Sequence, residues 1–203
     1  MATRMVLKEL SFEHAETHVA AGAAYVDLRD VDDYLDVHIP RSIALQYEFG
    51  PGFPVRARDC IPLEVPFVLL DRPDVDMSFA AASLRGKGFA VLGVLRDGLA
   101  RWASVHGNPV STEAAAGATA PQGTLLDVGD PGAPRVDGAV RISIERLWVQ
   151  TPAPSQTPVV IIAGRGVRAS LAVGILERRG QDQIVFWKAS TRATASPLPS
   201  PSR

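Results

Sequence analysis

The feature that most constrains the fold is an order of segments that occurs twice. In VVIIAGRGVRAS, residues 159–170, an apolar β-branched run stops at Ala163, two glycines and two arginines follow, and a helical pattern then begins. This order predicts a buried strand, a tight loop and a helix N-terminus, where backbone amides can hold an anion. The segment PFVLLDRPDVDMSFAAASL, residues 66–84, has the same order. Two such units predict parallel strands covered by helices.

Each unit belongs to a longer repeat. A short strand ending in an aspartate, Asp27 or Asp127, comes first and is followed by a polar turn and a second short strand. A buried strand, a loop, an amphipathic helix ending at a glycine and a last strand complete the pattern. We therefore expect an α/β protein of two domains, each a mostly parallel sheet flanked by helices.

Domain boundaries follow from composition. The stretch GNPVSTEAAAGATAPQG is poor in large apolar residues and is typical of a linker. The proline- and serine-rich end of the chain has too little apolar surface to offset the entropy of ordering. We predict a first domain, a linker, a shortened second domain and a disordered tail, at residues 1–107, 108–123, 124–190 and 191–203.

Helix ends are marked by capping residues. Ser11 is the expected N-cap of a helix over 12–21 that stops at Gly22, and Asp76 or Ser78 is the expected cap of the helix after the first loop. Gly180 is expected to end the last helix.

Composition excludes several classes of function. A net charge of -1 provides no field for nucleic acid, and no segment approaches the roughly 18 apolar residues of a membrane span, so we expect a cytoplasmic protein. A single cysteine, Cys60, excludes a disulfide within the chain and a multi-thiolate metal site. His14 and His18 lie one turn apart without a third ligand, so we expect no metal and no cofactor.

Two stretches carry a resemblance to a known family. VDLRDVDDYLDVHIPRSIAL and IIAGRGVRAS resemble the rhodanese-homology domain, in which a His-Ile-Pro turn precedes the second strand and a Cys-x-x-Gly-x-Arg-Ser loop follows a later one. The resemblance covers roughly residues 5–188 and is strongest to the tandem rhodanese region of metallo-β-lactamase-fold persulfide dioxygenases, without their metal-binding domain. His38 belongs to the turn, for which we expect a structural role. The matching positions in the turn segment are Asp27, Arg29, His38, Ile39 and Pro40, with Val37 and Arg41 in place of the two glycines.

The resemblance implies sulfurtransferase chemistry that this chain lacks. In the family, a cysteine at the head of the loop takes a sulfane sulfur from thiosulfate and forms a persulfide, which needs a thiolate. Ala163 and Asp71 stand at the two cysteine positions, and Asp74 and Asp76 replace the glycine and arginine of the first loop. Acidic side chains there would repel an oxyanion, although Asp71 and Asp74 could form a pair of acid and base groups. We predict two degenerate loops and no catalytic residue.

Two questions stay open at this point. The second loop either binds a small oxyanion through a nest of amides with two arginines, or its glycines only fit the turn and it binds nothing. Cys60, near Arg56 and Arg58, is either a nucleophile or a small buried apolar residue. The candidate anion-binding residues are Gly164, Arg165, Gly166, Val167 and Arg168.

The function predicted from these observations is that of an inactive rhodanese-like protein. It would act as an anion-binding or protein-interaction and regulatory module in sulfur metabolism, with a small oxyanion or a protein as its partner. The alternative is a thiosulfate or persulfide sulfurtransferase that uses Cys60 or a thiol supplied by a partner chain.

Overall fold

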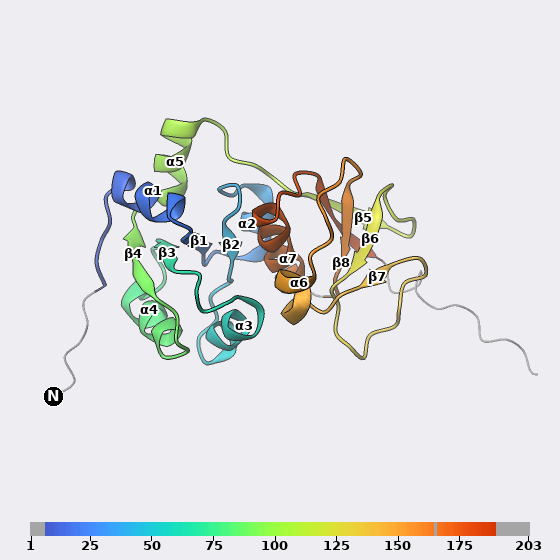
Figure 1. Ribbon diagram of the computed structural model, residues 1–203, viewed down its shortest axis with the longest axis horizontal. Helices are drawn as coiled ribbons and strands as arrows, with labels where there is room; N and C mark the ends of the chain where they lie inside the picture. Colours follow the sequence, from blue (N-terminus) through green and yellow to red (C-terminus); the bar gives the residue numbers. More distant parts are fainter. Residues whose placement is uncertain (1–6, 165, 190–203) are drawn as a thin grey trace, which may run out of the picture.

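The computed structural model describes residues 7–164 and 166–189, which form two parallel sheets (Figure 1). Every strand pair in both sheets is parallel, which confirms the predicted class of parallel sheets flanked by helices. The first sheet has the order β2-β1-β3-β4 and the second the order β5-β9-β8-β6-β7. The strands are β1 Ala24–Asp27, β2 Ile43–Ala44, β3 Phe67–Leu70, β4 Val91–Leu95, β5 Glu113–Gly117, β6 Thr124–Asp127, β7 Val140–Arg141, β8 Val159–Ile162 and β9 Ile184–Ala189.

The repeat in the sequence is also a repeat in topology. The segment around Glu9 runs parallel to β4, with the Leu10 amide donating to the Val94 carbonyl and the Val94 amide donating to the Lys8 carbonyl. When the segment around Glu9 is counted as an edge strand, the order of the first sheet is this segment, then β4, β3, β1 and β2. The second sheet reads β5-β9-β8-β6-β7, which is the same order of equivalent strands.

The structure confirms the helix ends that were predicted from capping residues. The Ser11 side chain accepts a hydrogen bond from the His14 amide, and the Asp76 carboxylate accepts from two amides at the start of α4. Gly22 and Gly180 have φ of 104° and 88°, the left-handed conformation that favours glycine after a helix. The helices are α1 Phe12–Ala20, α2 Val31–Asp36, α3 Gly52–Cys60, α4 Met77–Arg85, α5 Gly98–His106, α6 Ile144–Gln150 and α7 Gly166–Arg178.

The second sheet begins inside the segment predicted as a linker. Residues Glu113–Gly117 form β5, which pairs with β9 along its whole length. Most of its side chains are exposed at the sheet edge, so alanines suffice there and the segment carries no large apolar residue that would mark a strand. Composition alone therefore reads this edge strand as a linker.

The two sheets share one core, and α7 lies at its centre (Figure 1). One contiguous apolar cluster includes Val26 and Ile43 of the first sheet and Leu126 and Ile161 of the second. Residues 169–176 of α7 are all buried. A helix buried on all sides has to be apolar or small all round, as the sequence ASLAVGIL is.

The contact between α7 and β2 is unusually close at Gly174. A Cβ built on Gly174 would lie 2.3 Å from the Ser42 carbonyl oxygen and 3.1 Å from the Ile43 Cα. Only a residue without a side chain allows the two backbones to approach this far. Gly174 therefore sets the distance between the two halves.

Near the end of α7, a buried histidine joins the halves. The His38 ring is fully buried; its Nδ1 lies 2.8 Å from the Tyr34 carbonyl oxygen and its Nε2 lies 2.9 Å from Glu177 Oε1. The Arg41 amide donates to the other oxygen of Glu177. His38 thus has a structural place in its turn and also ties the first half to α7.

The outer faces of the two sheets are covered differently. Helices α1 and α5 pack on the outer face of the first sheet, around Leu10, Tyr25 and Val68. The outer face of the second sheet is covered by loop residues such as Val136, and there the Trp187 side chain is buried.

Candidate functional site

The loop that follows β8 lines a pocket between the two halves of the molecule. Ala163 stands at the head of this loop, at the carboxyl end of the strand, and the residue is 8% exposed. Gly164, Gly166 and Val167 line the same pocket, which has a volume of about 620 Å³. The carboxyl edge of a parallel sheet is the usual place for a ligand in an α/β protein.

A residue of the first half closes one side of this pocket. Val31, the first residue of α2, contacts the start of α7, and a Cβ built on Gly166 would lie 2.9 Å from Val31 Cγ1. Glycine at position 166 therefore permits α2 to approach the loop. The pocket depends on both halves being packed together, although the loop itself belongs to the second.

Most of the pocket wall is apolar. The apolar wall residues come from α2, the loop before β7, the end of β8 and β9; they include Val31, Pro134, Val136, Ile162, Ala163 and Phe186. Lys188, at 49% side-chain exposure, and Asp32, at 83%, stand at the rim with their charged atoms 3.6 Å apart. The described residues accordingly give the pocket an apolar interior and a rim that carries the ion pair of Lys188 and Asp32.

Asp127 lines the pocket but is fully engaged in holding the turn after β6. One carboxylate oxygen accepts a hydrogen bond from the Gly129 amide at 2.8 Å, and the other lies 3.4 Å from the Arg141 guanidinium. Asp27 has the equivalent place after β1, where it accepts from the Arg29 amide and guanidinium. The repeated aspartate thus shapes a turn in each half, because a carboxylate can bond the amide two residues ahead.

Arg168, predicted to bind an anion, forms ion pairs with two carboxylates. Its guanidinium nitrogens lie 3.0 Å from Asp130 and 3.3 Å from Glu145. It lines a separate small hollow of about 220 Å³ and not the pocket at Ala163. Arg165 lies outside the described residues. Of the five predicted anion-binding residues, the structure brings Gly164, Gly166 and Val167 together around the pocket.

The three aspartates of the first loop have separate structural surroundings. Asp76 caps α4, as the sequence predicts. Asp74 receives two hydrogen bonds from the Arg72 guanidinium, at 2.9 and 3.0 Å, and these bonds hold the pKa of Asp74 below its ordinary value. Asp71 lies in a hollow of about 280 Å³ that also contains Glu9 and Arg96. With Asp74 bound by Arg72, nothing in the geometry supports an acid and base pair with Asp71.

Cys60 is a buried apolar residue in this structure. It ends α3 with 4% of its surface exposed. Burial, followed by the charges of Glu145 and Asp59, raises the pKa of the thiol to about 12. A thiol with that pKa is almost entirely protonated at neutral pH, and the protonated form is not a nucleophile. This environment argues against the alternative in which Cys60 carries sulfur.

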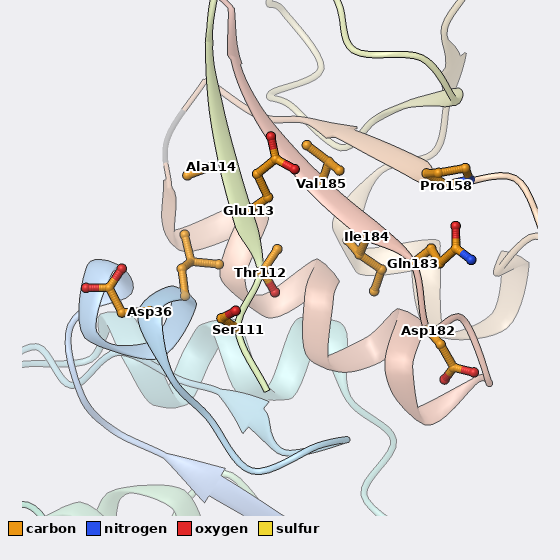
Figure 2. A pocket seen from close by; sticks show the side chains of 11 residues that line it. Asp36, Ser111, Thr112, Glu113, Ala114, Pro158, Asp182, Gln183, Ile184 and Val185 are labelled. Carbon is orange, nitrogen blue, oxygen red and sulfur yellow. The ribbon is translucent and has the colours of Figure 1, made fainter. Parts of the chain in front are cut away.

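A second, more polar hollow lies at the opposite edge of the second sheet and was not predicted from the sequence (Figure 2). Its volume is about 740 Å³, and of the described residues that line it three are acidic, Asp36, Glu113 and Asp182, and none is basic. Figure 2 shows Asp36 and Asp182 on opposite sides of the hollow. These residues are far apart in the chain and form no motif, so no sequence signal could find the hollow.

The described part of the chain holds no group of three histidine, cysteine or acidic side chains arranged for a metal ion. None of its helices has the length and apolar character needed to cross a membrane.

Comparisons with known proteins find similarity only among solved structures. No family model matches the chain, and no curated protein matches it. A thiosulfate sulfurtransferase from Pseudomonas aeruginosa aligns with 97% of this chain at 18% identity and a TM-score of 0.40. The chain spans about half of that protein, since the alignment covers 47% of it.

Proposed function

We propose that this protein is a rhodanese-like protein without sulfurtransferase activity, which binds a small ligand in the pocket at Ala163. Such a protein would serve sulfur metabolism as a binding or regulatory module. The observation that carries the proposal is the identity and position of Ala163, a methyl group at the head of a strand-loop-helix unit where the family resemblance places the nucleophile.

Sulfur transfer through this site would need an atom that the site lacks. The reaction proceeds by attack of a thiolate on a sulfane sulfur, which leaves a persulfide on the protein. Alanine has no lone pair to attack with, and Asp71 stands at the equivalent position in the first half. The surroundings of Cys60 keep its thiol protonated, and Cys60 lines the separate small hollow that also contains Arg168.

Binding remains possible without the nucleophile. The pocket has the size of a small-molecule site, and it opens at the start of the 13-residue helix α7. The first amides of a helix have no partner within the helix, and they carry the positive end of its dipole. Gly166 and Val167, the first residues of α7, line the pocket.

The proposal is tested by assaying transfer of sulfur from thiosulfate to cyanide, with the parent protein and the Cys60→Ser variant side by side. We expect both to remain at the rate of the protein-free blank. Turnover by the parent that disappears in Cys60→Ser would overturn the proposal in favour of a working sulfurtransferase. Turnover that persists in Cys60→Ser would place the chemistry on another group and would overturn it as well.

A further inference from the structure

We propose that the ligand of the pocket at Ala163 is an organic anion with an apolar body, such as an alkyl or aryl sulfonate or carboxylate. This inference rests on the proposed function, which makes the pocket a binding site, and adds the chemical class of the ligand. It contrasts with an inorganic oxyanion such as thiosulfate, which has no apolar part.

The walls of the pocket determine the body of the ligand. Val31, Ile162 and Phe186 come from three different elements and line one space of about 620 Å³, which Ala163, Pro134 and Val136 also line. Pockets of roughly 300–1,000 Å³ with mostly apolar walls are typical of drug-sized organic molecules. An inorganic anion would leave this apolar surface in contact with water and would gain nothing from it.

Ala163 is part of this apolar wall. A cysteine thiolate at the loop head would place a charge in the pocket wall, whereas the methyl group of Ala163 is apolar and belongs to the same buried cluster as Phe186. The residue that removes catalysis therefore also makes the pocket suitable for an apolar body.

The charges around the pocket determine the head group. Among the described residues that line the pocket, Lys188 is the cation, and the start of α7 adds the positive end of a helix dipole. The carboxylate of Asp127 is occupied by the Gly129 amide and the Arg141 guanidinium, and the side chain of Asp32 is 83% exposed to solvent. Of the described lining residues, Lys188 is therefore the charged group that an incoming anion can bind, with Asp32 as its exposed competitor.

Linear alkane sulfonates from methane- to hexanesulfonate provide the probe series, with thiosulfate as the inorganic reference and calorimetry as the measurement. Burial of each additional methylene contributes about 0.8 kcal/mol, so we expect affinity to rise about fourfold per methylene until the apolar space is filled. Thiosulfate and methanesulfonate should bind too weakly to measure.

Two variants separate the head from the body of the ligand. Lys188→Gln should lower the affinity for every sulfonate of the series by a common factor, and Lys188→Arg should restore it. Lys87→Gln, on the exposed turn after α4, is the matched control. Val136→Ser, in a loop at the pocket wall, should reduce the gain per methylene. Far-ultraviolet circular dichroism checks that each variant is folded.

The outcomes distinguish this inference from the proposed function. Equal binding of thiosulfate and hexanesulfonate would overturn the ligand class while leaving an inactive, ligand-binding protein in place. Sulfonate affinity that is unchanged in both Lys188→Gln and Val136→Ser would place the sulfonate outside this pocket. Lack of binding by any sulfonate would exclude this class of ligand. Either outcome overturns the inference. The proposed lack of catalysis is judged separately, by the sulfur-transfer assay.

Discussion

Replacing Gly174 with alanine tests how closely α7 packs against β2, because two physical effects on stability then have opposite signs. In the interior of a helix, alanine is favoured over glycine by about 1 kcal/mol. At this site, however, the new Cβ would lie 2.3 Å from the Ser42 carbonyl oxygen. That oxygen also accepts a hydrogen bond from the buried Tyr34 hydroxyl at 2.9 Å, so it has little freedom to move.

The expected magnitude follows from these two effects. A Cβ and a carbonyl oxygen rarely approach within 3.0 Å, so α7 and β2 must separate by roughly 1 Å to admit the new Cβ. Overpacking of this kind costs about 1–3 kcal/mol and sometimes more. The separation also strains the pair of His38 and Glu177, which lies three residues further along α7. Because the carbonyl oxygen has little freedom to move, we expect a cost in the upper half of this range, and after subtraction of the gain in helix propensity a net loss of about 1–2 kcal/mol in the free energy of unfolding.

Urea unfolding measures this loss. Tryptophan fluorescence reports on both halves, because Trp102 packs beside the first sheet and Trp187 lies in the second. Gly86→Ala is the control: Gly86 is exposed at the end of α4 with φ of -61°, and its new Cβ would meet only carbonyl oxygens of its own helix. We expect the control to be neutral or slightly stabilising. A Gly174→Ala variant as stable as its parent would refute the close contact between α7 and β2.

Three further predictions concern single side chains. Cys60 should react with Ellman's reagent near pH 8 only after unfolding in guanidinium, and rapid labelling of the native thiol would contradict its burial. Because the pKa of the folded thiol, about 12, lies above the ordinary value of 9.0, the contribution of Cys60 to stability is complete below pH 9.0 and is lost as the pH rises toward 12. The Cys60→Ala variant should therefore show a smaller decline of the unfolding free energy at alkaline pH. In a Cys60→Ser background, Ala163→Cys should be alkylated by iodoacetamide near neutral pH faster than free N-acetylcysteine, because the start of α7 stabilises a thiolate; an ordinary rate would show that the helix amides do not face that position. Asp76→Ala should lower the free energy of unfolding by about 1 kcal/mol through loss of the α4 cap, whereas Asp74→Ala, at an exposed ion pair, should change it much less; equal losses would refute the capping role.

The features that could be predicted from the sequence are those encoded locally. The apolar runs of β3 and β8 predict buried strands, and Ser11, Asp76 and Gly180 mark helix ends, because each acts on neighbours a few residues away. The same locality explains why the loop after β8 could be placed at the head of α7 from its sequence alone.

The features that could not be predicted depend on contacts between distant residues. β5 is a strand because it pairs with β9, about 70 residues later, and its own alanines carry no such signal. The same is true of Arg168, whose carboxylate partners lie 23 or more residues away in the chain. A cation in a sequence motif can be read as an anion-binding group, whereas its ion pairs are visible only in the folded molecule.

The burial of α7 between the sheets has a consequence for hydrogen exchange. An amide in a helix that is covered on every side exchanges with solvent only when the covering elements open. Residues 169–176 are covered by both sheets at once, so their exchange should require an opening in which the two halves come apart and α7 loses its surroundings. The slowest amides in the molecule should therefore lie in α7, and their protection should report the stability of both halves as one cooperative unit.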